Sequence, residues 1–260
     1  MEPTPGEPQL PNLSALNLNH KPRRELTSDA QNGIYCLNRE DSIEGCSSQV
    51  LLYRNALPIR DGEFEEAAQF MINQVKQEQK MGNRVPRKQC TFGSVKYKQY
   101  QLFSDTNSWP SIVKRVREAT QAFAAQLGIA NPNEYDGVHA NFYADEEDSV
   151  IPHSDAEKQL VKGEPIFSYT YIINNNDELA RGFQIYKMPS AGGDVDGKGK
   201  VADIILKSGD LLVMMGDMQE LFNHGIDKRK GKKSTTGARL NFTVRKFVQS
   251  EKVLKRKAGD

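Results

Sequence analysis

The second half of the chain consists of short segments rich in β-branched and aromatic residues, separated by Gly, Pro, Asn and Asp. This pattern is typical of strands. The last segment alternates strictly between apolar and polar side chains, so that strand has one apolar face and one polar face. Because about seven such strands follow two helical segments, the sequence predicts an α+β fold with helices packed on a β-sandwich or jelly roll. The clearest strand segments are 138–143, 166–173, 181–188, 201–206, 211–215 and 238–247.

Two helices are predicted before these strands, after one early strand at 47–57. The first helix is expected to begin near Asp61, a residue type that caps helix N-termini, and the second near Pro110. The second is expected to end at Gly128. In both helices the apolar residues recur at helical spacing, which is typical of a face packed on a sheet. These apolar positions are Phe64, Ala67, Ala68, Met71, Ile72 and Val75, then Ile112, Val113, Val116, Ala119, Phe123 and Leu127.

The chain divides into three regions by composition. Residues 1–45 are polar and interrupted by prolines, which predicts a disordered N-terminal tail. Residues 46–248 have the length and patterning of one domain. Residues 249–260 form a basic C-terminal tail, and the Lys-Val-Leu-Lys-Arg-Lys run at 252–257 fits either a nuclear-import signal or a phosphate-binding tail.

Charge and cysteine content limit the class of protein. The 35 basic and 34 acidic side chains give a net charge of +1, so the overall charge does not indicate a nucleic-acid binder. The odd number of cysteines, none at metal-ligand spacing, argues against a disulfide framework and a cysteine zinc site. Neither a secretory signal nor a membrane-spanning apolar run is visible. We therefore expect a soluble intracellular protein, in a reducing compartment and with no membrane partner.

A candidate metal site comes from two histidines and one aspartate. The segment 152–155, Pro-His-Ser-Asp, places His153 and Asp155 on one side of an extended backbone, and His224 follows a hydrophobic segment much later. Two imidazoles and one carboxylate form the facial triad, which leaves three metal positions open and suits Fe(II) that must bind a co-substrate and dioxygen. The alternative is that these are ordinary surface or core residues, because His-x-Asp is common by chance.

The polar face of the last strand is a candidate anion site. Two arginines facing inward are costly unless they meet anions, and a dicarboxylate would satisfy both with bidentate geometry. An Asn-x-Tyr pair on an earlier strand could donate to the same ligand. The alternative is an exposed polar sheet face with solvated arginines. The donors on the two strands are Asn141, Tyr143, Arg239, Asn241, Thr243 and Arg245.

The order of these motifs, Asn-x-Tyr, His-x-Asp, His and Arg-x-Asn-x-Thr-x-Arg, resembles the AlkB family of Fe(II)- and 2-oxoglutarate-dependent dioxygenases. Within that family the chain looks most like the animal homologue that repairs alkylated duplex DNA. The Val-Pro-Arg-Lys-Gln-Cys-Thr-Phe-Gly segment is similar to the start of the family's nucleotide-recognition lid. The matching stretches are 85–93, 141–143, 152–171, 208–226 and 238–247.

The resemblance implies a double-stranded β-helix, or jelly roll, with a lid at about 76–105. It implies that His153, Asp155 and His224 bind Fe(II) and that the six donors on the two strands hold 2-oxoglutarate. It also implies oxidative demethylation of bases such as 1-methyladenine and 3-methylcytosine in DNA or RNA. In that reaction 2-oxoglutarate and O2 are converted to succinate and CO2, and the N-methyl group leaves as formaldehyde.

Such a substrate base must be flipped out or already single-stranded. The resemblance implies that basic residues in 76–98 and 228–246 contact phosphates, and that lid aromatics, Tyr100 among them, stack on the base. The segment 77–83 lacks the aromatic wedge of the duplex-repairing relative, which favours a single strand. The acidic run 145–148 is expected to face away. The expected substrate-binding residues are Met81, Arg87, Phe92, Tyr97 and Glu157, in a monomer that acts in the nucleus or cytoplasm.

Two other functions remain open on the sequence. An oxygenase acting on a protein or small molecule would keep the iron and 2-oxoglutarate residues without needing a basic cleft. A non-catalytic binding module on the same scaffold would need neither the triad nor both arginines, so their presence together counts against it. The fold alone does not separate these functions, and the site residues decide between them.

Overall fold

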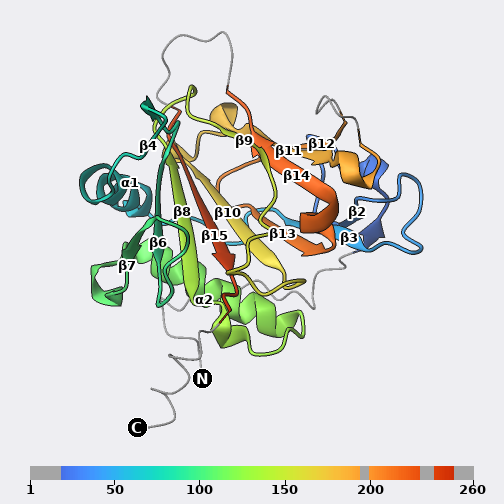
Figure 1. Cartoon of the computed structure of the whole chain (residues 1–260), viewed down its shortest axis with the longest axis horizontal. Helices are drawn as coiled ribbons and strands as arrows, with labels where there is room; N and C mark the ends of the chain where they lie inside the picture. Colours follow the sequence, from blue (N-terminus) through green and yellow to red (C-terminus); the bar gives the residue numbers. More distant parts are fainter. Residues whose placement is uncertain (1–18, 194–198, 229–236, 249–260) are drawn as a thin grey trace.

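The structure is a computed structural model that describes residues 19–193, 199–228 and 237–248. Its main strands form two sheets that face each other (Figure 1). Within the described residues, the larger sheet has the order β1 (His20–Lys21), β2 (Gly33–Cys36), β3 (Ser48–Tyr53), β13 (Leu211–Gly216), β10 (Ile166–Ile172), β15 (Arg239–Arg245), β8 (Gly137–Tyr143), β6 (Lys88–Phe92) and β7 (Gln101–Phe103). The smaller sheet has the order β12 (Lys200–Leu206), β11 (Arg181–Lys187), β14 (Phe222–Ile226) and β9 (Val150–His153).

From β8 to β15 the chain passes back and forth between the two sheets. Strands β8, β10, β13 and β15 lie in the larger sheet, and β9, β11, β12 and β14 lie in the smaller one. This arrangement is consistent with the double-stranded β-helix expected from the sequence. Among the described residues, no helix combines the length and the apolar character that a membrane crossing requires.

Two helices, α1 (Glu63–Gln74) and α2 (Ser111–Gln126), pack on the outer face of the larger sheet (Figure 1). Because side chains alternate along β15, this strand gives the larger sheet one apolar face and one polar face. Leu240, Phe242 and Val244 are buried in the core under the helices, as the apolar face of that strand predicts. The polar residues of the same strand must therefore face the interior between the two sheets.

The first helix differs from its predicted form at two positions. It begins at Glu63, and Gly62, with a φ of +77°, is the N-cap in place of Asp61. The Glu63 carboxylate accepts a hydrogen bond from the Arg60 backbone N–H at 2.8 Å and pairs with Arg115 of α2, which ties the two helices together. Ile72, predicted to be a core residue, is 49% exposed because it lies at the edge of the apolar stripe.

The N-terminal region is folded further upstream than the sequence predicts. Residues 19–45 are described, and β2 pairs with β3 in antiparallel register. Tyr35 and Leu37 are completely buried in the core between the sheets. The prediction of a disordered tail over 1–45 is therefore wrong for this part, because strand pairing and a few buried side chains compensate for a polar composition. Residues 1–18 and 249–260, which include the two tail predictions, lie outside the described residues.

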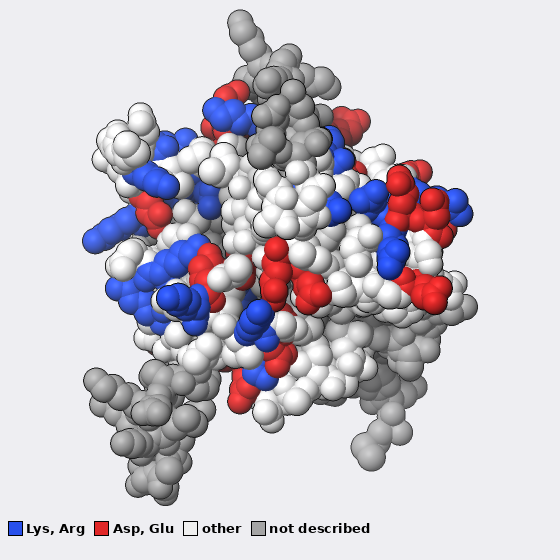
Figure 2. All heavy atoms as spheres, turned by 45° about the vertical axis from the view of Figure 1, so that its right-hand side comes forward, with Lys and Arg blue, Asp and Glu red and all other residues white. Residues whose placement is uncertain are grey.

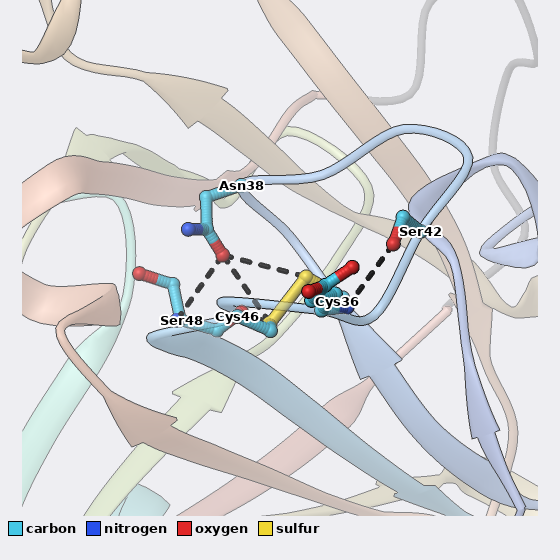
Figure 3. Close-up of a disulfide and its surroundings, with 6 residues drawn as sticks. Cys36, Asn38, Ser42, Cys46 and Ser48 are labelled. Carbon is cyan, nitrogen blue, oxygen red and sulfur yellow. Dashed lines mark hydrogen bonds between the residues drawn. A yellow bond between two sulfur atoms is a disulfide. The ribbon is translucent and has the colours of Figure 1, made fainter.

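Cys36 and Cys46 form a disulfide, although the cysteine count argued against a disulfide framework (Figure 3). Their Cα atoms are 5.8 Å apart, and the bond closes the loop between β2 and β3. Beside it, the Asn38 side chain accepts a hydrogen bond from the Ser48 backbone N–H at 3.3 Å. An odd cysteine count says nothing about which two thiols the fold brings together; Cys90 is the remaining one and is fully buried.

Only part of the segment expected to be a lid lies outside the sheets. Strands β6 and β7 belong to the larger sheet, so the expected span of 76–105 is too wide. The parts that project are the hairpin of β4 (Gln79–Lys80) and β5 (Asn83–Arg84) and the loop 93–100. We call these two segments the hairpin and the β6–β7 loop.

Candidate active site

The structure brings the three predicted metal ligands together. His153 ends β9, Asp155 follows two residues later, and His224 lies opposite His153 in the neighbouring strand β14. Their ligand atoms all lie within 4.8 Å of one another. One carboxylate oxygen of Asp155 is 3.9 Å from His153 Nε2, and the other is 3.8 Å from His224 Nε2. His153 and His224, which lie 71 positions apart in the sequence, are thus brought together by the pairing of β9 with β14.

The electrostatics of this cluster favour metal ligation. Burial lowers the pKa of His224 to about 3 and also lowers the pKa of His153, so both rings are neutral at physiological pH. Burial alone would raise the pKa of Asp155, but Arg245, whose Nη2 donates to its carboxylate at 2.7 Å, and the two histidines hold it well below its usual range. Neutral imidazoles and an ionised carboxylate are the forms that bind a metal.

The donor set fits a facial triad for Fe(II). His153 Nδ1 lies 3.0 Å from the Ile151 carbonyl oxygen, which leaves Nε2 for a metal. The His224 ring stacks on Phe183 at 5.2 Å between centroids, and this contact fixes its plane. Two nitrogens and one oxygen on one side of a metal leave the opposite side open for a co-substrate.

Buried arginines lie next to the triad, on the polar face of β15. Arg239 and Arg245 are 2% and 4% exposed, and Asn241 and Thr243 are buried between them. The alternative of an exposed polar sheet face is therefore wrong. Arg239 Nη2 donates to Thr170 Oγ1 at 2.9 Å, whereas its Nε and Nη1 have no hydrogen-bond partner among the described residues. Burial lowers the pKa of Arg239 to about 10, so this guanidinium is still charged and suited to an anion.

Neighbouring side chains hold these donors in place. The Asn241 amide donates to Ser168 Oγ at 2.8 Å, and Thr243 Oγ1 donates to Asn241 Oδ1 at 3.1 Å. The Arg239 guanidinium lies over the Tyr143 ring at 5.2 Å, which orients both groups. These donors are therefore arranged by the fold before any ligand binds.

One cavity of about 530 Å³ connects the triad, the arginines and the hairpin. All three triad residues line it, as do Arg239, Asn241, Thr243 and Arg245. Residues of the hairpin and the β6–β7 loop, with the adjoining Glu78, also line it. These residues are Glu78, Lys80, Met81, Asn83, Arg84, Tyr97, Lys98 and Tyr100.

A family model described as "2OG-Fe(II) oxygenase superfamily" matches residues 54–245, about three quarters of the chain and all of the site. The chain belongs to the 2OG-Fe(II) oxygenase superfamily. The members of this superfamily use Fe(II), 2-oxoglutarate and O2. The triad of His153, Asp155 and His224 is the feature of this oxygenase that fits Fe(II).

Curated relatives support the likeness to the AlkB family. The chain is 25% identical over 257 residues to the human protein "DNA oxidative demethylase ALKBH2", covering 96% of this chain and 92% of the relative. It is 26% identical over 194 residues to the proteins of the same name from Bos taurus and Mus musculus, covering 73% of this chain and 64% and 74% of theirs. A solved chain described as "The structure of OsALKBH1" is 20% identical with a TM-score of 0.47, covering 76% of this oxygenase and 96% of that chain.

The predicted substrate residues are divided by the structure. Met81, Arg87 and Tyr97 line the cavity. Met81 is 93% exposed at the tip of the hairpin, with a φ of +52°. Phe92 is fully buried under the sheet, stacked on Phe103 at 5.5 Å. Its prediction as a substrate contact is wrong, because the alternation of β6 turns it into the core.

The half-buried Arg87 side chain donates hydrogen bonds to three other residues of the protein. Its Nε donates to Asn141 Oδ1 at 2.9 Å, its Nη2 to Gln89 Oε1 at 2.9 Å and its Nη1 to the Ser149 carbonyl at 3.2 Å. Because Arg87 occupies the Asn141 oxygen, the amide nitrogen is the group that Asn141 can offer to a ligand. Arg87 therefore orients a cavity residue, and its contact with substrate stays a prediction.

Glu157 lies outside the main cavity and pairs with Lys98 of the β6–β7 loop. It lines a neighbouring cavity of about 560 Å³, which shares Asp155 and Arg245 with the first. The Lys98 backbone N–H also donates to Gln159 Oε1 at 3.2 Å. These contacts join the β6–β7 loop to the segment that follows the metal ligands.

The acidic run at 145–148 does not simply point away. Asp148 is 1% exposed, and its carboxylate accepts hydrogen bonds from Arg84 Nη2 at 2.7 Å and from the Ala144 backbone N–H at 2.9 Å. Glu146 is buried as well. Asp148 thus anchors the hairpin beside the cavity, a role that sequence reasoning missed.

Sequence reasoning also missed His139, whose ring stacks on Tyr100 at 4.7 Å in the cavity wall. The alternation of 138–143 could have found it, because His139, Asn141 and Tyr143 share one face of β8. Tyr97 lies edge-on to the same ring at 5.5 Å and stacks under the Arg245 guanidinium at 5.1 Å. Two tyrosines and a histidine therefore form one aromatic wall.

The burial of His139 predicts a pH dependence of stability. Burial, with help from Arg245 and Arg87, lowers the pKa of His139 well below its usual value. Below about pH 6.5 the unfolded chain binds a proton at this ring that the folded protein does not. For this group, the free energy of unfolding should therefore fall by about 1.4 kcal/mol for each unit that the pH is lowered. The measurement is urea unfolding of the apoprotein at several pH values between 7.5 and 5. We expect the free energy of unfolding to depend less steeply on pH in His139→Phe than in the parent.

The matched control for this pH series is His20→Gln, at an exposed position in β1. This variant should keep the parent slope, because it does not remove a buried ring. Equal slopes for His139→Phe and the parent would contradict the prediction.

Proposed function

We propose that the protein is an oxidative demethylase that removes N-alkyl groups from bases such as 1-methyladenine and 3-methylcytosine in DNA or RNA. The observation that carries this proposal is the single cavity that joins the triad, the buried arginines and an aromatic, hairpin-covered wall. The relatives named as DNA oxidative demethylases support the same substrate class.

In this proposal His153, Asp155 and His224 hold Fe(II), and the donors on β8 and β15 hold 2-oxoglutarate. Arg239 pairs with the distal carboxylate, because its Nε and Nη1 have no partner among the described residues and its burial demands an anion. Arg245 lies at the iron end, where it holds Asp155 ionised. Tyr143, Asn141, Asn241 and Thr243 complete the binding site.

Bound iron, with 2-oxoglutarate and O2, supplies the oxidising chemistry: one oxygen atom enters succinate and the other hydroxylates the N-methyl group, which leaves as formaldehyde. The residues of the chain bind and orient the reactants and exclude water from a buried interior. The Asp155 carboxylate stays ionised throughout, since Arg245 donates to it at 2.7 Å. The protein's contribution is therefore positional and electrostatic.

The substrate base is proposed to stack beside Tyr100 and His139 after it leaves its own strand. The exposed Lys76, Lys80 and Lys96 are placed to contact phosphates, whereas Arg84 and Lys98 already pair with acidic residues. In the second basic stretch, 228–246, Lys246 pairs with Glu134 and Glu164. Residues 229–236 of this stretch lie outside the described residues. On the face shown in Figure 2, basic and acidic side chains of the described residues are mixed.

The hairpin tip favours a single-stranded substrate. A hairpin tip with an exposed Met81, and no aromatic residue over 77–83, offers a poor wedge for a duplex. We therefore propose single-stranded DNA or RNA ahead of duplex DNA, read by a monomer in the nucleus or cytoplasm.

The test is succinate release from 2-oxoglutarate by the Fe(II)-loaded protein, with methylated and unmethylated oligonucleotides. Single-stranded DNA, duplex DNA and RNA carrying 1-methyladenine or 3-methylcytosine run in parallel, with His153→Ala as the blank. We expect succinate release to rise with methylated single strands. Formaldehyde should appear in an amount equal to this increase in succinate. Turnover that ignores every oligonucleotide would contradict the demethylase and favour an oxygenase acting on a protein or small molecule.

A further inference from the structure

A short helix connects the metal-binding strand β14 to the preceding strand of the larger sheet. This helix, α3 (Met218–Leu221), follows β13 directly and ends where β14 begins, three residues before His224. The Gln219 side chain on α3 accepts a hydrogen bond from the backbone N–H of Asp155 at 2.7 Å. The Gln219 side chain therefore links the segment that leads into His224 to the backbone of Asp155, 64 positions earlier in the sequence.

The segment that carries Asp155 needs such a contact. Strand β9 ends at His153, so Asp155 lies outside the strand and its N–H is not part of a sheet ladder. At the other end of the residue, Arg245 Nη2 donates to the carboxylate at 2.7 Å. The backbone and the carboxylate of Asp155 are thus held by two different groups.

The helix that presents Gln219 is itself fixed. The Asp217 backbone N–H donates to the Ser47 carbonyl oxygen at 2.8 Å, and Met218 is completely buried between the sheets. Gly216 has a φ of +63°, and a Cβ there would lie 2.0 Å from the Ser47 oxygen, so only glycine allows this approach. Gln219 Nε2 donates to Met214 Sδ at 3.3 Å, which sets the orientation of the amide.

We propose that Gln219 is a positioning residue for the metal site: it fixes the Asp155 backbone so that the carboxylate stays between His153 and His224. This inference rests on the proposed metal triad. Groups that hold metal ligands in place typically change metal affinity by about 10–100-fold when they are removed. A residue with a purely structural role would change the stability of the fold and leave the affinity of the folded protein unchanged.

The test is a Mn(II) titration of the full-length protein without 2-oxoglutarate, with the free ion followed by electron paramagnetic resonance. Gln219→Met keeps the size of the side chain and removes the acceptor, and it should weaken Mn(II) binding by about 10–100-fold. Gln219→Glu keeps an acceptor oxygen at the same reach and should bind Mn(II) like the parent. Gln219→Asn is one methylene too short to reach Asp155 and should resemble Gln219→Met.

Two further variants separate the possible failures. Glu220→Gln, on the same helix, removes a surface ion pair with Lys162 at 3.0 Å and should leave Mn(II) affinity unchanged. Asp155→Ala should abolish binding. Circular dichroism and thermal melts restrict the comparison to variants that fold; if Gln219→Met does not fold, Gln219→Asn takes its place against Gln219→Glu.

The outcomes are distinct. Weak binding by Gln219→Met or Gln219→Asn, with rescue by Gln219→Glu, supports the inference. Parent-like affinity in the variants that lack the acceptor, alongside loss in Asp155→Ala, overturns the inference and leaves the triad intact. Parent-like affinity in Asp155→Ala as well means that the proposed triad is wrong.

Discussion

Replacing Asp155 with Asn should lower succinate release from 2-oxoglutarate by more than about 100-fold, since even groups that only support metal ligands are worth about 10–100-fold. The change removes the anionic ligand that lies within 4 Å of both histidine rings. It also leaves the buried guanidinium of Arg245 without the carboxylate that it contacts at 2.7 Å. Removing one partner of a buried ion pair typically costs about 3–5 kcal/mol, so the free energy of unfolding should fall as well.

These two effects can be measured separately. Urea unfolding of the apoprotein reports the stability loss, and succinate release at saturating Fe(II) and 2-oxoglutarate reports the activity loss. The matched control is Asp177→Asn, which breaks a half-exposed ion pair with Lys207 at 3.1 Å and should change stability by about 1 kcal/mol or less. Retention of activity by Asp155→Asn would show that this carboxylate is not a metal ligand.

Replacing Arg239 with Met should raise the KM for 2-oxoglutarate on the order of 100-fold with a smaller change in kcat, since hydrogen bonds to charged groups are worth about 1.5–3 kcal/mol each. The guanidinium is 2% exposed, and its Nε and Nη1 have no partner among the described residues. A carboxylate is the group that would satisfy these donors. Initial rates of succinate release against 2-oxoglutarate concentration measure the effect.

The apoprotein gives an independent check on Arg239. Burying a guanidinium that lacks a carboxylate partner is costly, so Arg239→Met should leave the apoprotein at least as stable as the parent, in contrast to Asp155→Asn. Arg239→Lys keeps the charge and loses the planar fork, so its KM should lie between those of the parent and the Met variant. A KM within about threefold of the parent in Arg239→Met, well under one such hydrogen bond, would contradict the proposed role.

Local pattern was enough to predict the longer strands β3, β8, β10, β11, β12, β13 and β15, and the two faces of β15, but it missed shorter strands such as β9 and β14. The alternation over 238–247 placed Leu240 and Phe242 in the core and Arg239 on the opposite face, because a strand has a period of two whatever it pairs with. It could not show whether that polar face was solvated or buried. That depended on the smaller sheet, which covers it.

Predictions failed where a residue's environment is set by a partner distant in sequence. Phe92 is an aromatic residue of the kind that stacks on bases, but the pairing of β6 with β8 places its side chain in the core. Cys36 and Cys46 bond because β2 and β3 bring them together. Arg87 and Glu157 stay predictions as substrate contacts, and their partners in the structure, Asn141 and Lys98, are also distant in sequence.

The sequence by itself determined the membership of the chain in an iron- and 2-oxoglutarate-dependent family, because the order and types of His153, Asp155, His224 and the two arginines of β15 are properties of the chain. Only the tertiary structure decided that the triad, the arginines and the hairpin open into one cavity. It also decided that Gln219 reaches the Asp155 backbone. The physical reason is that side-chain alternation is local, whereas convergence depends on which strands pair across long stretches of sequence.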